Sequence, residues 1–187
     1  MKILGRNFYE RDTVLVAQEL LGKVLFFNNT AGKIVETEAY YGKKDPGSHA
    51  YRGITERNKI MFGPPGFSYV YFCYGSHFLF NVVTEKYGIP GAVLIRALEP
   101  VKGMSLMVQR RKTQVKKELC NGPGKLTQAL GISGASNNKD ITCRPFCIFD
   151  DNAGNFEIVK TTRIGIKQGS ELKLRFYIKG NECVSKT

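Results

Sequence analysis

The sequence has no hydrophobic run near the ~18 residues that a membrane-spanning helix needs. It also lacks the apolar core of a secretory signal, because residues 1–4 lead directly into Gly5-Arg6-Asn7. We find no internal repeat, low-complexity tract or linker in its 187 residues. These absences predict a protein without a membrane segment that is not secreted and that forms one domain over residues 1–187.

Cysteines are few, and their spacing is unsuited to a structural metal. The five cysteines are odd in number and scattered, and Cys143 and Cys147 are four residues apart. No second pair and no nearby histidine completes a zinc-binding set. We therefore expect reduced thiols and no bound metal.

Acidic residues are few relative to basic ones. Sixteen Asp and Glu residues stand against 28 Lys and Arg, which gives a net charge of +12 and a pI near 9.5. Such an excess attracts polyanions, nucleic acid first and an anionic membrane surface second. The densest basic segment is 101–120, where the charges are typical either of a solvated helix face or of phosphate binding.

Alternating side chains predict a β-strand over residues 32–40. Successive side chains of a strand point to opposite faces, so Glu36, Glu38 and Tyr40 share one face. Burying two carboxylates is costly unless both are paired, so this face is either solvated or part of a polar site. Arg96, in the middle of another predicted strand, is the expected partner of Glu36 or Glu38.

An aromatic-rich hairpin is predicted over residues 68–83, with its turn at Tyr74-Gly75-Ser76. Tyr74 falls at the tip, where its ring either packs on another loop or enters a partner as a wedge. Asn81 interrupts an apolar strand, so its amide needs hydrogen-bond partners or a ligand. Alternation gives each strand one common face, formed by Tyr69, Tyr71 and Cys73 on the first and by His77, Leu79 and Asn81 on the second.

The rest of the chain is predicted to mix helices and strands. A helix capped by Asp12 comes first, and a Pro- and Gly-rich loop over 42–66 contains His49, which in isolation is typical of a surface histidine. A helix over 125–130 begins after Asn121-Gly122-Pro123-Gly124, whose backbone N–H groups would suit a phosphate. The helix capped by Asp12 is expected over residues 13–21 and another helix over 101–120. Strands are expected over 23–27, 91–98 (ended by Glu99-Pro100), 146–150, 156–160, 162–166 and 172–179, with a turn at 151–154.

With these residues in view, the chain resembles the alkyladenine (3-methyladenine) DNA glycosylase family nearly end to end. Several motifs in one order carry the resemblance. They are Leu4 to Tyr9, Ile34-Val35-Glu36-Thr37-Glu38-Ala39-Tyr40, Asp45 to Gly53, Arg57-Asn58, Met61 to Gly66, Tyr69-Val70-Tyr71 with Tyr74-Gly75, Asn81-Val82, Leu94 to Pro100, Gly122-Pro123 with Lys125-Leu126, and Leu174 to Tyr177.

The resemblance implies an α+β fold, with a curved antiparallel sheet, flanking helices and a protruding β-hairpin. It implies a monofunctional DNA N-glycosylase of base-excision repair that needs no cofactor. The implied partner is double-stranded DNA with damaged purines, and the implied oligomeric state is a monomer. Its location would be cytoplasmic, at the nucleoid, in a bacterium and nuclear in a eukaryote.

The same resemblance implies roles for individual residues. Glu38 would activate the water, and Arg96 would help to hold that water and a nearby phosphate. A backbone carbonyl near Ile164 would also hold it. Tyr74 would fill the gap left in the base stack. The damaged base would be bound by Tyr40, His49, Tyr71, Asn81 and Leu94, with Asn81 screening out unmodified guanine.

Two departures from the family pattern affect the expected site. Ser76 follows the wedge tyrosine where many members carry methionine or another bulky residue, so the neighbouring bases would be propped less. Phe80 precedes Asn81 where other residues are common, so a different pocket wall is expected.

Two other functions stay open from the residues alone. One is a non-catalytic domain that binds damaged DNA. The other is a glycosidase for free nucleosides or sugars that uses Glu36 and Glu38 as a carboxylate pair, although neighbours on one flat face cannot flank a bond from opposite sides. The sequence leaves the lesion preference open.

Overall fold

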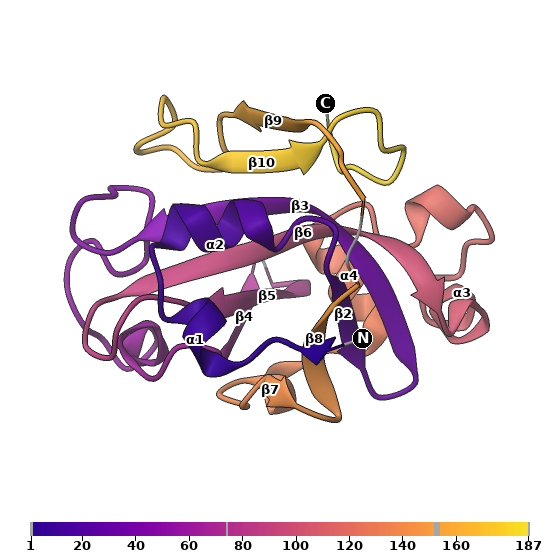
Figure 1. Ribbon diagram of the computed structural model, residues 1–187, viewed down its shortest axis with the longest axis horizontal. Helices are drawn as coiled ribbons and strands as arrows, with labels where there is room; N and C mark the ends of the chain where they lie inside the picture. Colours follow the sequence, from indigo (N-terminus) through magenta and orange to yellow (C-terminus); the bar gives the residue numbers. More distant parts are fainter. Residues whose placement is uncertain (1, 74, 152–153, 187) are drawn as a thin grey trace.

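The computed structural model describes residues 2–73, 75–151 and 154–186 (Figure 1). Its strands form one antiparallel sheet with helices against its faces, so the predicted α+β class is confirmed. The helices are α1 (Arg6–Tyr9), α2 (Thr13–Glu19), α3 (Met104–Arg111) and α4 (Pro123–Leu130), with short 3-10 turns η1 (Lys59–Phe62), η2 (Lys116–Glu118) and η3 (Gly134–Ser136). None of these described helices is long and apolar enough to cross a membrane.

The strands of the described residues follow the order β1-β8-β2-β3-β6-β5-β4, with β7 beside β8 and β10 between β3 and β9. Their bounds are β1 Lys2–Ile3, β2 Val24–Phe27, β3 Thr30–Tyr41, β4 Ser68–Cys73, β5 His77–Val83, β6 Gly91–Lys102, β7 Thr142–Cys143, β8 Phe146–Asp150, β9 Ile158–Thr161 and β10 Arg175–Ile178.

Strand β3 is the centre of the sheet. One of its edges pairs with β6 from Ala31 to Tyr41. The other edge is shared, because β2 covers its first residues and β10 covers Glu36 to Glu38. With both edges paired and α2 packed over one face, all residues from Ile34 to Ala39 are buried. The alternative of a solvated face for Glu36 and Glu38 is therefore wrong.

A bulge in the β3–β6 pairing gives Arg96 its place. Glu36 lies opposite Ala97, but Thr37 lies opposite Ile95, so Arg96 has no direct partner in the register. A bulge re-aims one side chain and bends the strand. Here the extra residue is the arginine predicted to contact the carboxylates of β3.

The hydrophobic core lies between the sheet and helices α2 and α4. Helix α2 begins at the predicted cap, where the Asp12 carboxylate accepts from the N–H groups of Val14 and Leu15. The core also receives the inner face of the β4–β5 hairpin, including Phe80, whose ring centroid is 5.0 Å from that of Phe146. The apolar alternation of strand and helix thus fixes which side of β3 faces the hydrophobic core.

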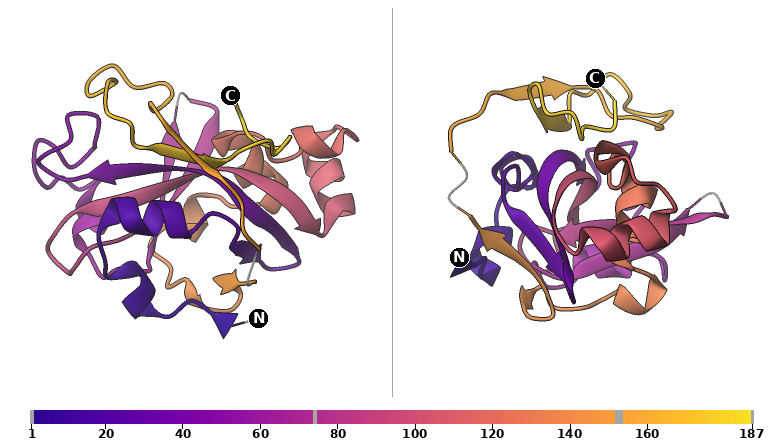
Figure 2. Two further views of the ribbon diagram at one scale, coloured as in Figure 1. Left: turned by 45° about the horizontal axis from the view of Figure 1, so that its top comes forward. Right: turned by 90° about the vertical axis from the view of Figure 1, so that its right-hand side faces the viewer.

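The β4–β5 hairpin projects from the body of the molecule (Figure 2, right). Its strands pair from Ser68–Val82 to Cys73–His77, but β5 pairs with β6 only over Asn81 to Val83. The outer half of the hairpin therefore extends beyond the sheet, as predicted. The proposed wedge, Tyr74, lies outside the described residues.

Several predicted boundaries are wrong. Strand β6 does not end at Pro100 but runs to Lys102, because Pro100 sits opposite Gly32 at a register irregularity, where a missing N–H is tolerated. This extension shortens the predicted helix over 101–120 to α3, which Lys112 closes with a φ of 54°. Residues 162–166, predicted as a strand, form a loop in which Gly165 has a φ of 79°.

Other elements match more closely. The predicted strands over 146–150 and 23–27 correspond to β8 and β2, and the helix over 125–130 corresponds to α4. The strands predicted over 156–160 and 172–179 are β9 and the shorter β10. The turn predicted at 151–154 falls partly outside the described residues.

Gly91, at the start of β6, provides a test of this packing. An added Cβ would lie 2.4 Å from Thr13 Oγ1 and 2.8 Å from Thr84 Oγ1, two hydroxyls fixed to each other by a hydrogen bond of 2.9 Å. We predict that Gly91→Ala lowers the free energy of unfolding by about 1–3 kcal/mol through overpacking, measured by urea denaturation. Gly154→Ala, whose Cβ would meet nothing within 4 Å, is the control. Equal stability of the two variants would contradict the packing described.

Candidate active site

A cavity of about 440 Å³ lies beside the end of β3, under the projecting hairpin. Its wall combines both histidines of the chain with three tyrosines, one from β3 and two from β4. The lining residues that bear on function are Tyr40, Gly47, His49, Tyr69, Tyr71, Cys73, His77, Leu79, Asn81, Leu94, Arg96, Gly122, Gly124, Lys125, Ile164 and Ile166.

The side chains of the hairpin that were predicted to share a face, from their alternation along each strand, line the cavity. All six residues predicted to share faces, from Tyr69 to Asn81, line the cavity. The structure also brings Tyr40, His49, Leu94 and Arg96 to the same cavity from β3, the 42–66 loop and β6. Phe80 points to the opposite side, into the core, so the expectation that it alters the pocket wall is wrong. Ser76 is exposed near the hairpin turn.

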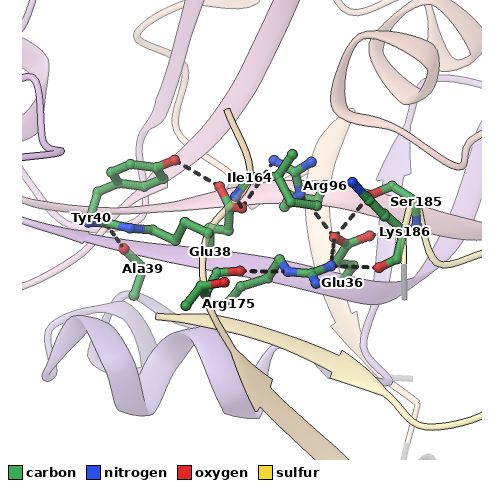
Figure 3. A network of polar contacts seen from close by, with 11 residues as sticks. Glu36, Glu38, Ala39, Tyr40, Arg96, Ile164, Arg175, Ser185 and Lys186 are labelled. Carbon is green, nitrogen blue, oxygen red and sulfur yellow. Dashed lines mark hydrogen bonds and ion pairs between the residues drawn. The ribbon is translucent and has the colours of Figure 1, made fainter. Parts of the chain in front are cut away.

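Glu38 lies directly behind this wall. Its side chain is 0% exposed and is not itself part of the lining, but three lining residues contact its carboxylate. The Tyr40 hydroxyl donates to Oε2 at 2.8 Å, and the backbone N–H of Ile164 donates to Oε1 at 2.8 Å (Figure 3). Arg96 Nη1 is 3.2 Å from Oε1. A carboxylate has about four acceptor positions, so Oε2 keeps one free.

Burial raises the pKa of Glu38 above its ordinary value of 4.5. The positive charge of Arg96, the Ile164 N–H and the Tyr40 hydroxyl each lower it again, while the negative charge of Glu36 adds to the increase. A carboxyl group with a raised pKa is a stronger base once it is ionised. The site thus holds a proton acceptor out of bulk water and beside a cation.

Arg96 is held between two carboxylates, as the sequence predicted. Its Nε donates to Glu36 Oε1 at 3.0 Å, while Nη1 faces Glu38 (Figure 3). Glu36 is itself held from the other side by Arg175 Nη1 at 3.0 Å and by the Ser185 N–H at 2.7 Å and hydroxyl at 2.9 Å. Glu36 therefore has a structural task, because Arg96, Arg175 and Ser185 occupy its carboxylate, which argues against a catalytic carboxylate pair.

The aromatic rings of the cavity form one contacting group. The centroids of His49 and Tyr71 are 4.8 Å apart, and those of Tyr69 and Tyr71 are 5.1 Å apart. His49 Nδ1 is 3.0 Å from the Tyr69 hydroxyl oxygen. Burial raises the pKa of Tyr69 to about 12 and raises that of Tyr71 as well, so both keep their protons at neutral pH. These rings offer flat faces to a flat ligand.

His49 is exposed at the cavity opening, yet protein atoms crowd one side of its ring. This partial burial, together with the positive charge of Arg57, lowers the pKa of His49 below its ordinary value of 6.5. At neutral pH the imidazole is therefore uncharged and offers one donor and one acceptor nitrogen.

Asn81 is 3% exposed, and its amide has a partner in the sheet. Its Nδ2 donates to the Tyr69 carbonyl at 3.0 Å, which orients the side chain. The predicted need of a buried amide for partners is thereby met on its donor side.

Several contacts of the site could not be read from the sequence. The carbonyl near Ile164 that was expected to hold the water stays a prediction, whereas the N–H group of Ile164 makes a contact that was not expected, to Glu38 Oε1. Ser185 carried no signal beyond its residue type, and Arg175 lies in the Leu174 to Tyr177 motif of the resemblance but had no predicted contact with Glu36. In the basic segment, Arg110 and Arg111 donate to the Ala129 and Leu119 carbonyls, so these two arginines hold α3 against its neighbours.

Helix α4 starts at the cavity, where Gly122, Gly124 and Lys125 form part of the wall. Glycine is required at position 124, because an added Cβ would lie 2.7 Å from Cγ of His77. Among the described residues, no group of three or more His, Cys, Asp or Glu side chains is placed to hold a metal ion.

Together, an aromatic cavity and a buried carboxylate beside an arginine define a site that can bind a flat aromatic group and take a proton next to it. Comparison with known proteins identifies the class. The methylpurine-DNA glycosylase family matches residues 7–182, and the chain belongs to this family of DNA-repair glycosylases.

Curated relatives extend over the whole chain. A protein of Carboxydothermus hydrogenoformans is 50% identical over 190 residues, covering 98% of this chain and 99% of the relative. One from Methanoculleus marisnigri is 50% identical, covering 98% of each chain, and one from Chlorobaculum tepidum is 46% identical, covering 100% of this chain and 92% of the relative. All three bear the name "Putative 3-methyladenine DNA glycosylase".

Removing Glu36 tests the ion-pair arrangement. We predict that Glu36→Ala lowers the free energy of unfolding by about 3–5 kcal/mol, because it leaves two buried arginines without their shared carboxylate. Thermal and urea denaturation would measure the loss. The matched control is Glu157→Ala, which breaks an exposed pair with Lys179 and should change stability by at most about 1 kcal/mol. A loss for Glu36→Ala no larger than that of the control would contradict the arrangement.

The raised pKa of Glu38 predicts a pH-dependent stability. Between pH 4.5 and its raised folded pKa, folded Glu38 binds a proton more strongly than unfolded Glu38, so stability falls as pH rises through this window. Glu38→Gln cannot titrate there, so its stability relative to wild type should increase with pH and then level off. Denaturation from pH 4 to pH 8 measures the difference, and Glu157→Gln is the control. A difference that does not vary with pH would exclude the raised pKa.

Proposed function

We propose that the protein is a monofunctional DNA glycosylase that removes alkylated or deaminated purines from duplex DNA. The candidate substrates are 3-methyladenine, 7-methylguanine, hypoxanthine and ethenoadenine. The observation that carries the proposal is the carboxylate of Glu38, buried behind the aromatic cavity and held by Tyr40, Arg96 and Ile164.

The cavity can accept a base only after the nucleotide has rotated out of the duplex, at a cost of a few kcal/mol. Stacking on aromatic rings recovers about 1–3 kcal/mol per base. Tyr71 and His49, whose rings contact each other, and Tyr40 from β3 supply such faces in the cavity lining. The net charge of +12 supports binding to the phosphate backbone, and the start of α4 with Lys125 offers N–H groups and a cation at the cavity.

The chemical step is hydrolysis of the bond between the sugar C1′ and the base nitrogen. A water oxygen forms a bond to C1′, one water proton passes to the free position of Glu38 Oε2, and the electron pair of the broken bond leaves with the base. The ionised Glu38 also stabilises the positive charge that develops on the sugar. Arg96 keeps the carboxylate oriented and offers donors to the water.

Alkylated bases such as 7-methylguanine carry positive charge and leave readily, whereas neutral bases such as hypoxanthine leave less readily. The uncharged His49 offers a hydrogen bond to a base edge without repelling a cationic base. Asn81 is fixed beside the aromatic rings of the cavity, where its side chain would oppose the amino group of guanine. Insertion of Tyr74 into the duplex, a monomeric state and a cytoplasmic or nuclear location remain predictions from the sequence.

Glu38→Gln provides the decisive test. Base release under single-turnover conditions should fall at least ~10²-fold, because general base catalysis contributes about 10²–10⁴-fold. Binding to the same duplex should persist, since the amide keeps the shape of the side chain. In wild type the rate should rise with pH through the raised pKa of Glu38, so its acid limb should lie above pH 4.5.

The assay uses duplexes with one hypoxanthine or ethenoadenine, and alkylated DNA, with abasic sites revealed by alkali. Glu157→Gln is the control for loss of an exposed glutamate. The absence of abasic sites from every substrate, at enzyme excess, would refute the proposal. Equal behaviour of wild type and Glu38→Gln would instead indicate a damage-binding domain without catalysis.

A further inference from the structure

A second ion pair lies close to the cavity, and the proposed mechanism does not use it. The side chains of Asp45 and Arg163 are both 0% exposed, and they form two hydrogen bonds of 2.5 Å and 2.6 Å between carboxylate and guanidinium. Asp45 follows β3, at the start of the loop that carries His49. Arg163 directly precedes Ile164 in the loop between β9 and β10.

The pair connects three segments of the cavity wall. Asp45 accepts from the N–H groups of Tyr41 at 3.2 Å and of Gly47 at 2.9 Å, which closes its own loop. Arg163 Nη1 also donates to the Ala39 carbonyl of β3 at 3.0 Å. The guanidinium carbon lies 4.6 Å from the centroid of the Tyr40 ring.

Stability alone is a poor explanation for this pair. A buried ion pair often contributes no more than well-packed apolar side chains of similar volume. Arg163 Nε is buried without a hydrogen-bond partner among the described residues, and such a donor costs about 1–3 kcal/mol. The position of the pair is more informative. Arg163 contacts the Tyr40 ring and directly precedes Ile164 in the chain, and both Tyr40 and Ile164 donate hydrogen bonds to Glu38.

We propose that Asp45 and Arg163 are positioning residues, which act on Glu38 through the Tyr40 hydroxyl and the Ile164 N–H that contact its carboxylate. This inference rests on the proposed function. Both bonds to Glu38 are 2.8 Å long, and they come from segments that the ion pair holds together. A displacement of about 1 Å in such an arrangement can reduce a rate ~10²-fold.

Loss of the pair has a predictable effect on the pH profile. Without the Ile164 N–H and the Tyr40 hydroxyl, burial dominates at Glu38, and its pKa moves up. The acid limb of the rate should then shift to higher pH. The groups that face Glu38 from the surrounding elements are Glu36 and Tyr40 on β3, Tyr71 on β4, Arg96 on β6, and Arg163 with the Ile164 N–H from the 162–169 loop.

The experiment compares variants with different changes in charge. In Asp45→Asn, the side-chain NH₂ group faces the N–H donors of Arg163, and the positive charge of Arg163 loses its counter-charge. Arg163→Lys keeps the charge but loses the paired hydrogen bonds. Gly47→Ala changes no charge, but its Cβ would lie 2.8 Å from Arg163 Nη2 and 2.9 Å from the Gln168 carbonyl, so it pushes the loops apart.

For each variant we expect base release under single-turnover conditions to be ~10–10²-fold slower than in wild type. The DNA concentration that gives half-saturation should stay within about threefold of the wild-type value. The acid limb should shift to higher pH in all three. Gly47→Ala keeps the test available should Asp45→Asn fail to fold. Controls are Gly154→Ala, whose Cβ meets nothing, and Asp140→Asn, which breaks the half-exposed pair with Arg6 away from the cavity. Both should keep the wild-type rate and pH profile.

Two results would overturn the inference. One is a rate within threefold of wild type for a folded variant in which the pair is broken. The other is a shift of the acid limb that depends only on the change in charge. In that case the uncompensated Arg163 of Asp45→Asn would move the acid limb to lower pH, and Gly47→Ala would not move it. An inactive wild type would refute the proposed function instead, so the two failures are distinguishable.

Discussion

The arginine of β6 that bridges two glutamates of β3 is the contact on which the site depends. Burying two carboxylates in the central strand is favourable only if both are paired and hydrogen-bonded. Arg96 meets this requirement for Glu36 and Glu38 together, and Arg175 and Ser185 complete the acceptors of Glu36. The two carboxylates therefore have different tasks: Glu36 holds Arg96 in place, and Glu38 lies behind the cavity wall.

The fold explains why this contact forms where it does. A bulge in the β3–β6 pairing turns Arg96 toward the carboxylates, and β10 covers the edge of β3 at the same height. The aromatic wall arises separately, because β5 pairs with β6 over only three residues and lets the hairpin extend past the sheet. The cavity is the space between these two arrangements, and loops closed by Asp45 and Arg163 form its remaining sides.

The family assignment and the geometry support each other from independent directions. The family match spans residues 7–182, which includes the central strands, the hairpin and the loop around Ile164. The geometry supplies what a family name does not, namely which atoms contact Glu38 and which side of Arg96 each glutamate occupies. It also separates basic residues that hold the fold, such as Arg110 and Arg111, from those, such as Lys125, that face the cavity.

The sequence alone determined the elements whose side chains alternate or cap: β3, the aromatic hairpin, helix α2 with Asp12, and the pairing of Arg96 with the glutamates. These follow from local periodicity and from the cost of an unpaired buried charge, both of which are visible in one segment at a time. Tertiary structure decided the rest. The continuation of β6 through Pro100, the loop in place of a strand at 162–166, the amide of Ile164 on Glu38 and the Asp45–Arg163 pair all depend on contacts between segments distant in sequence. Such contacts carry no local pattern, because the partner of a side chain is set by where the whole chain folds.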